Sequence, residues 1–207
     1  MSHTLLTEIS TGSLAPGEKL NEVALAARLG VSRNTLREAF VALNEFGVVE
    51  RLPHRGVFVM LPDVSHVDEI YAFRALLEPA ALQWGQNLDV HALADCVADG
   101  RAARDAGDPD AVGDANQRFH STIIAATGSV YADDIMARVL ALMRLVFIRG
   151  SVERRGFHFP YVEQNARITE LAAAGRRAEA ADAMRSYLDC ARCEVRELLA
   201  EAAALHR

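Results

Sequence analysis

The chain has 207 residues, of which 51% are hydrophobic and 24% charged, so it can bury a large core and is not intrinsically disordered. Its three cysteines form no paired framework, and its first residues lack the basic start and apolar run of a signal peptide. Arginines interrupt even its most apolar stretch, residues 135–148, so we expect a cytoplasmic protein without membrane spans.

The net charge of −6 is unevenly distributed along the chain. Residues 1–62 carry six basic and six acidic side chains, so the whole negative balance lies in residues 63–207. A polyanionic partner requires basic residues clustered on one face rather than a basic average. The acidic total therefore does not exclude a nucleic-acid partner for the first part of the chain.

Apolar spacing and turn residues predict three helices and a β-hairpin in the first 62 residues. Gly30 ends the second helix, Ser32 caps the third, and the turn of the hairpin is formed by residues 53–56. The predicted elements are helices over 4–10, 21–29 and 33–46 and strands over 48–52 and 57–60. This order is that of a winged helix-turn-helix, whose third helix enters the major groove of DNA. The alternative is a small α+β domain with no nucleic-acid role.

From residue 63 onward the apolar spacing predicts only amphipathic helices. The six predicted segments are 65–86, 90–106, 109–126, 131–153, 160–174 and 177–205. Their short connections fit antiparallel neighbours in a bundle. We therefore predict a mainly α protein with two domains, a winged helix-turn-helix (residues 1–62) and an all-α antiparallel bundle of about six helices (residues 63–207).

Three stretches of the first domain carry recognisable motifs: Leu14-Ala-Pro-Gly-Glu-Lys-Leu-Asn-Glu22, Leu29-Gly-Val-Ser-Arg-Asn-Thr-Leu-Arg-Glu-Ala39 and Pro53-His-Arg-Gly-Val-Phe-Val59. In this order they resemble the DNA-binding domain of GntR-family transcription regulators over residues 5–60. Phe73-Arg-Ala-Leu-Leu-Glu78 and Phe119-His120 make the second domain similar to the FCD effector domain of the FadR subfamily, and six helices suit its VanR-like branch. The resemblance implies a homodimer that binds a palindromic operator and a small-molecule effector.

The start of the predicted recognition helix carries the side chains best suited to read DNA. Ser32 and the free N–H groups of the helix N-terminus can meet a phosphate. Arg33 and Arg37 share one face, and each offers a guanidinium fork that fits the O6 and N7 atoms of guanine. Asn34 and Thr35 are secondary candidates. Arg37 has an alternative partner in a neighbouring carboxylate, Glu38 or Glu45.

The hairpin turn supplies a second group of candidate DNA contacts. Gly56 permits a close approach of the backbone, and His54 and Arg55 can reach the minor groove or the phosphates. The alternative for His54 is a turn residue without a DNA contact.

The FCD resemblance also implies a divalent metal held by one carboxylate or amide and three histidines. Asn116 and His120 match the first pair of ligands, four residues apart on one helical face. Asn165 and Tyr187 stand where two further histidines are expected. Because a single imidazole remains, we expect no zinc, nickel or other cofactor, with Asn116 and His120 the candidate ligands if a metal binds.

A metal-free pocket for a small molecule is the prediction that remains for the helical domain. The donors that suit a carboxylate or sugar acid there are Arg74, Asn116, His120, Arg144, Asn165 and Tyr187. Arg74 has an alternative partner in Glu78, one helical turn later. Arg144 and Arg149 stand in an apolar stretch, so we expect them to face either the pocket or a dimer partner.

These patterns predict a metabolite-responsive DNA-binding regulator, and the family tendency indicates a repressor. The alternative is a constitutive dimeric DNA-binding protein whose helical domain only dimerises and binds no ligand. The sequence has no nucleophile elbow, phosphate-binding glycine loop or His-Glu-x-x-His motif, so we expect no enzymatic activity.

Overall fold

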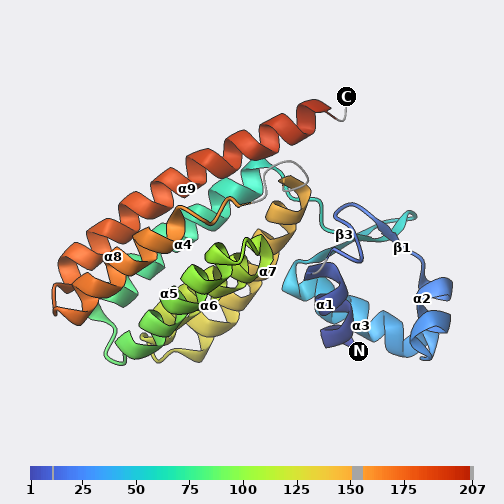
Figure 1. The fold of residues 1–207 in the computed structure, drawn as a ribbon. Helices are drawn as coiled ribbons and strands as arrows, with labels where there is room; N and C mark the ends of the chain where they lie inside the picture. Colours follow the sequence, from blue (N-terminus) through green and yellow to red (C-terminus); the bar gives the residue numbers. More distant parts are fainter. Residues whose placement is uncertain (11, 151–155, 206–207) are drawn as a thin grey trace.

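The structure is a computed structural model, and it describes residues 1–10, 12–150 and 156–205. Its first part forms a small domain to one side of a helical bundle (Figure 1). The elements of this part are α1 (Ser2–Ser10), β1 (Lys19–Leu20), α2 (Glu22–Leu29), α3 (Arg33–Phe46), β2 (Val49–Leu52) and β3 (Gly56–Val59). The elements of the bundle are α4 (Val64–Trp84), α5 (Val90–Asp105), α6 (Pro109–Ala125), α7 (Val130–Gly150), α8 (Tyr161–Ala173) and α9 (Arg177–Leu205).

Local capping sets the turn between α2 and α3. Asn21 caps α2 by accepting hydrogen bonds from the backbone N–H groups of the first turn, and Gly30 ends the helix with a φ of 65°. Ser32 caps α3 by accepting from the N–H of Thr35. Both caps satisfy donors that a helix N-terminus leaves free, and Gly30 adopts the left-handed conformation that side chains resist. The predicted start of the recognition helix is confirmed.

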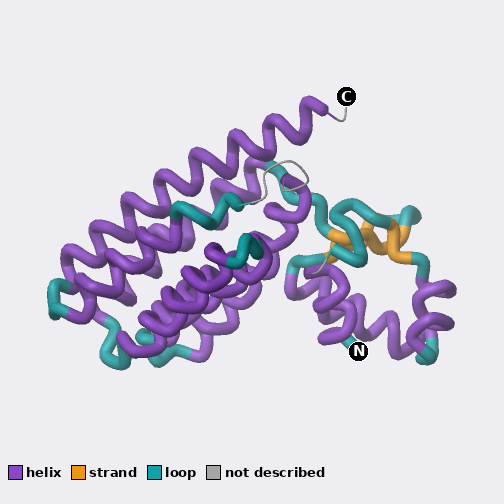
Figure 2. Tube along the Cα trace, viewed as in Figure 1, coloured by secondary structure: helices purple, strands orange, loops and turns teal. Residues whose placement is uncertain are grey.

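The small sheet has three strands rather than the two of the predicted hairpin. Its strand order is β1-β3-β2, all antiparallel, with Leu52 opposite Gly56 in the hairpin and Lys19 opposite Phe58 on the other edge. Figure 2 shows these strands apart from the helices of the bundle. The extra strand is two residues long, which is too short to show an alternation of apolar and polar residues.

The helical part contains the six predicted helices, with ends that agree to within two residues where the structure describes them. Residues 151–153, the predicted end of the 131–153 helix, lie outside the described residues. The helix α9 lies along α4, and α5 lies along α6 (Figure 1). No helix in the described ranges is long and apolar enough to cross a membrane.

Two hydrophobic clusters form the cores of the protein. One gathers buried side chains of α1 to β3, and the other those of α4 to α9. Leu145 of α7 is fully buried in the first cluster although its helix belongs to the bundle. The helix α7 therefore contributes to both cores.

Three arginines of α7 donate hydrogen bonds to main-chain carbonyl groups that precede the bundle in the chain. Arg138 Nε donates to the Phe46 carbonyl oxygen at 3.3 Å, and Arg144 Nε to that of Ser10 at 3.0 Å. Arg149 donates to the carbonyl oxygen of Pro62. We expected Arg144 and Arg149 to face either the pocket or a dimer partner. Arg149 instead bonds the segment between the two parts, and Arg144 bonds a carbonyl at the end of α1, where a helix leaves carbonyl groups free.

Candidate functional site

The two arginines of the recognition helix lie together on its exposed face. Both side chains are 59% exposed, and both bond one carboxylate: Glu22 Oε1 lies 2.7 Å from Arg33 Nε, and Glu22 Oε2 lies 2.9 Å from Arg37 Nε. Hydrogen bonds from Arg37 and then from Arg33 lower the pKa of Glu22. Exposed ion pairs of this kind are weak, so the guanidinium groups remain accessible to another anion.

The other predicted residues of this helix pair locally. Arg37 bonds neither Glu38 nor Glu45 in this structure, since Glu22 of α2 is its carboxylate partner. Asn34 Nδ2 donates to Glu38 Oε1 at 3.0 Å. The hydroxyl groups of Ser32 and Thr35 lie 2.9 Å apart. The helix thus presents two arginines supported by one acidic residue, with its polar first turn alongside.

The hairpin turn holds its three predicted residues in a constrained conformation. His54 has a φ of 61°, the one positive value among the described residues other than glycine, and Gly56 has a φ of 112°. Arg55 lies over the ring of Phe58, 5.5 Å from its centre, and Lys19 Nζ lies 5.9 Å from the same ring. The aromatic ring therefore positions two cations at the tip of the hairpin.

A groove of about 1070 Å³ separates the recognition helix from this hairpin. Four cations line it, namely Lys19, Arg37, Arg51 and Arg55, together with His54 and two carboxylates. A groove with this excess of positive charge suits a phosphate backbone. Lys19 was missed in the sequence because the strand that carries it was not predicted.

Five of the six predicted effector-binding residues meet in the bundle, in one hydrogen-bonded network that also includes Glu78. Arg74 Nε lies 2.7 Å from Glu78 Oε1, and His120 Nδ1 lies 2.6 Å from Glu78 Oε2. All three side chains are almost fully buried. Burial alone would raise the pKa of Glu78, but the charge of Arg74 and the contact with His120 outweigh burial and lower the pKa. Burial lowers the pKa of His120, so a neutral imidazole and an ionised carboxylate face each other.

The chain of polar groups continues from His120 to the next helices. The Tyr187 hydroxyl lies 3.2 Å from His120 Nε2 and 3.0 Å from Asn116 Oδ1. Asn165 Nδ2 donates to Asn116 Oδ1 at 2.8 Å. The alternative that Arg74 pairs with Glu78 is confirmed, and Glu78 also connects Arg74 to the rest of this buried network.

The buried network encloses almost no space. The void beside it measures about 10 Å³, which is room for about one water molecule. Two buried atoms of the network, Arg74 Nη2 and Asn165 Oδ1, have no hydrogen-bond partner among the described residues. The predicted pocket around these residues is therefore closed in this structure, because its polar groups mostly satisfy one another.

The same geometry argues against a metal at this place. Both nitrogens of His120 already face other side chains, and the two flanking amides are weak ligands for zinc or nickel. Within the described ranges, no group of three or more His, Cys, Asp or Glu side chains has the arrangement of a metal site. The donor set does not fit the metal that the FCD resemblance implies.

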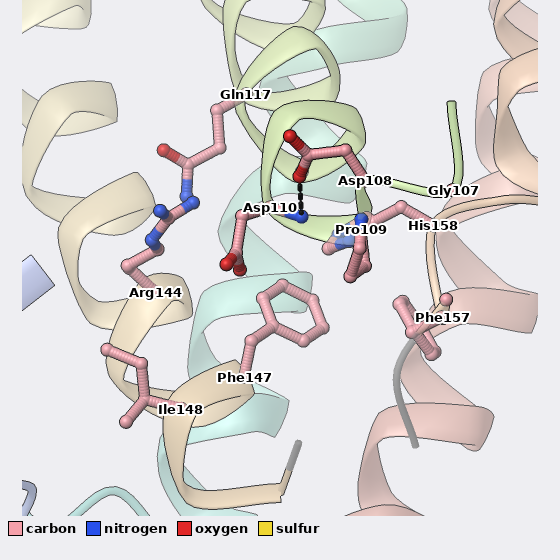
Figure 3. A pocket seen from close by; sticks show the side chains of 12 residues that line it. Gly107, Asp108, Pro109, Asp110, Gln117, Arg144, Phe147, Ile148, Phe157 and His158 are labelled. Atoms are coloured by element: carbon pink, nitrogen blue, oxygen red, sulfur yellow. Dashed lines mark hydrogen bonds between the residues drawn. The ribbon is translucent and has the colours of Figure 1, made fainter. Parts of the chain in front are cut away.

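Arg144 lies outside the buried network and lines a larger cavity of about 490 Å³ between α6, α7 and the segment before α8. Figure 3 shows Arg144 and Gln117 on one side of this cavity and Phe157 and His158 on the other. Burial lowers the pKa of His158 to about 3, and the positive charges of Arg74 and Arg144 contribute to the shift, so its imidazole is neutral at neutral pH. The prediction that all six residues form one site was wrong for Arg144, because its Nε donates to the Ser10 carbonyl and its Nη1 to Asp114 rather than to the network around Glu78.

Comparison with protein families gives two matches along the chain. The model described as "Bacterial regulatory proteins, gntR family" matches residues 2–59. The model described as "FCD domain" matches residues 69–189, more than half of the chain.

Several individual proteins are similar over most of their length. An uncharacterized HTH-type transcriptional regulator in the TAR-I ttuE-ttuC' intergenic region of Agrobacterium vitis is 32% identical over 130 residues, covering 59% of this chain and 76% of that protein. HTH-type transcriptional regulator LutR of Bacillus subtilis is 27% identical, covering 87% of this chain and 92% of that protein. The crystal structure of a GntR transcriptional regulator from Rhodococcus sp. RHA1 superimposes with a TM-score of 0.86 at 32% identity, covering 94% of both chains. All three are described as transcriptional regulators rather than enzymes.

Proposed function

Because the chain belongs to the GntR family of bacterial regulatory proteins and carries an FCD domain, we propose that it is a metabolite-responsive, DNA-binding transcriptional regulator. One observation carries the DNA-binding half of this proposal: Arg33 and Arg37 lie exposed on one face of a capped recognition helix, beside a basic groove. Bidentate contacts from such arginines to guanine discriminate against a wrong base by about 1–3 kcal/mol each.

We propose that the protein acts as a homodimer on a palindromic operator, with one recognition helix in each half-site. The helix α4 supports this proposal, because Leu76 and Trp84 are 80% and 65% exposed on it. Exposed large apolar side chains of this kind are typical of interaction surfaces. The six helices after the wing support a place in the FadR subfamily, in its VanR-like branch.

In the proposed mechanism the protein is a repressor and its effector is a small carboxylate or sugar acid. Binding of the effector lowers the affinity of the protein for the operator. The effect is a coupling free energy, so the operator weakens effector binding by the same factor. The α7 arginines support this mechanism because they connect the helical bundle to the DNA-binding part.

A second candidate is a constitutive DNA-binding protein that binds no effector. The closed network around Glu78 favours it, because these polar groups satisfy one another and leave only a small void. Under this alternative the network serves to fix the packing of the bundle.

The test begins with the full chain and a pool of random duplex DNA, from which bound sequences are selected and read. We expect a palindromic site, and we expect Arg37→Ala to bind it far more weakly while its circular dichroism spectrum stays unchanged. A thermal-shift screen with small carboxylates, sugar acids and divalent ions, together with metal analysis, then separates the two candidates. A ligand that binds only the folded protein raises its melting temperature. Selection of no sequence would contradict the proposal, and a sequence preference without any effector would favour the second candidate.

A further inference from the structure

Resting on the proposed function, we propose that the 490 Å³ cavity beside Arg144 binds a small monocarboxylate with an apolar ring, and that Arg144 holds its carboxylate. Its volume lies within the range of small-molecule sites, roughly 300–1,000 Å³. The closed network around Glu78 offers no comparable space. The cavity is therefore a place in the bundle where a ligand can enter without unpacking the core.

Arg144 has one guanidinium nitrogen available for a ligand. Its Nε donates to the Ser10 carbonyl and its Nη1 to Asp114 Oδ1 at 2.7 Å, while Nη2 bonds no described residue. A guanidinium binds a carboxylate best through two parallel N–H groups. A ligand that takes Nε and Nη2 displaces the Ser10 carbonyl, and this exchange loosens a contact between the bundle and the DNA-binding part.

The rest of the lining argues for an apolar body on the ligand. Phe147 and Phe157 lie 5.1 Å apart and His158 lies 4.5 Å from Phe147, all measured between ring centres. These rings form one wall of the cavity (Figure 3), and a neutral His158 adds no charge to it. An aromatic ring packs favourably against such a wall.

The acidic residues at the mouth limit the charge of the ligand. Asp108 and Asp110 line the cavity, and Asp114 bonds Arg144. These carboxylates repel each further negative charge on a ligand, so a dianion or trianion is disfavoured more strongly than a monoanion that binds Arg144. The cavity therefore favours a monocarboxylate over a dicarboxylate or tricarboxylate.

Calorimetric titration of the full chain with phenylacetate tests the site directly, in the absence of DNA. We expect binding of phenylacetate, weaker binding of gluconate, which has no apolar ring, and no binding of uncharged phenylacetamide. Loss of a charge-assisted hydrogen bond predicts that Arg144→Gln weakens phenylacetate binding by at least about tenfold. Arg138→Gln is the matched control, because Arg138 also bonds the first domain but does not line the cavity. We expect it to bind phenylacetate as the wild type does.

A second variant tests the site without touching a charge. A Cβ at Gly113 would lie 3.6 Å from His158 Nδ1 and 3.7 Å from Arg144 Nη1, which is ordinary contact. Gly113→Ala therefore narrows the cavity while favouring the helix, and we expect weaker phenylacetate binding with no loss of melting temperature. Failure of phenylacetate to bind, equal binding of the amide, or equal losses in Arg144→Gln and Arg138→Gln would each overturn the inference.

Operator binding distinguishes this inference from the proposed function. If phenylacetate binds through Arg144 but leaves operator affinity unchanged, the site stands and the proposed regulation fails. If another metabolite releases the operator while phenylacetate does not bind, the regulation stands and the site is wrong.

Discussion

The same pair of residue types, arginine and glutamate, meets twice in this molecule under opposite conditions. At the surface of the recognition helix, Glu22 of α2 bonds Arg33 and Arg37; both arginines are more than half exposed and Glu22 is partly exposed. In the bundle, Glu78 bonds Arg74 with both side chains nearly inaccessible to solvent. Water screens the first arrangement, so its guanidinium groups can exchange partners. The second is locked, because breaking it would leave a buried charge without a counterion.

The largest effect that would test this contrast is Glu78→Ala. The substitution leaves Arg74 buried without its carboxylate and removes the Nδ1 partner of His120, so we expect the bundle to lose about 3–5 kcal/mol of unfolding free energy. Urea denaturation followed by circular dichroism measures the loss. Glu78→Gln, which keeps the shape but not the charge, serves as the control for packing. A loss below about 1 kcal/mol for the alanine variant would show that the buried pair is not locked.

The second effect is on the exposed side of the comparison. We expect Arg37→Ala to lower operator affinity by about 1–3 kcal/mol, because one bidentate contact to a base is lost. The unfolding midpoint should not change. Fluorescence anisotropy with labelled operator measures the affinity. Arg28→Ala is a suitable control, since Arg28 bonds Glu8 away from the basic groove. Equal losses for the two variants would mean that general charge, rather than a base contact, holds the DNA.

The third effect is the pH dependence of stability. The folded-state pKa of His158 is lowered to about 3 and that of His120 is also lowered, so the unfolded chain takes up protons below pH 6.5 that the folded chain does not. The two neutral histidines therefore contribute their full share to the unfolding free energy above pH 6.5. This contribution falls as the pH drops, by at most about 1.4 kcal/mol per pH unit for each histidine.

Unfolding experiments between pH 7 and 5 isolate this contribution, because the carboxylates with lowered pKa titrate in the unfolded chain below this window. We expect His158→Gln to flatten the dependence. A wild-type protein of constant stability over this range would contradict the neutral state of both imidazoles in the folded protein.

The smallest effect concerns Glu22. Glu22→Gln removes the carboxylate that competes with DNA for Arg33 and Arg37, so we expect affinity for nonspecific DNA to rise by roughly threefold at low salt. The unfolding midpoint should stay the same. Filter binding at several salt concentrations measures the change. If affinity instead falls, the role of Glu22 is to orient the two arginines rather than to compete for them.

The sequence was sufficient to predict what depends on local pattern. The spacing of apolar residues predicted the six helices of the bundle, and Ser32 and Gly30 predicted the turn before the recognition helix. Asn116 and His120 share a helical face as expected, and both join the buried network.

The spacing of apolar residues could not predict contacts between residues that are distant in the chain. Arg37 found its carboxylate in Glu22, fifteen residues earlier, rather than in a neighbour on its own helix. Arg144 bonds Ser10 across 134 residues, and no local pattern distinguishes a carbonyl in another domain from a ligand or a dimer partner. The closure of the network around Glu78 was also unforeseen, because residue types indicate donors and acceptors but not whether they satisfy one another.

The position of Leu145 limits how the first domain can be joined to another helical bundle. This side chain of α7 fills a place in the core of the first domain, so that domain is not a self-sufficient module. A chimera joined after residue 62 to an unrelated bundle would leave a hole where Leu145 packs, and holes of that size are costly. Transfer of this DNA-binding part to another bundle therefore requires an apolar side chain in the place of Leu145, more than 80 residues beyond the junction, with Ala141 and Leu142 packing beside it.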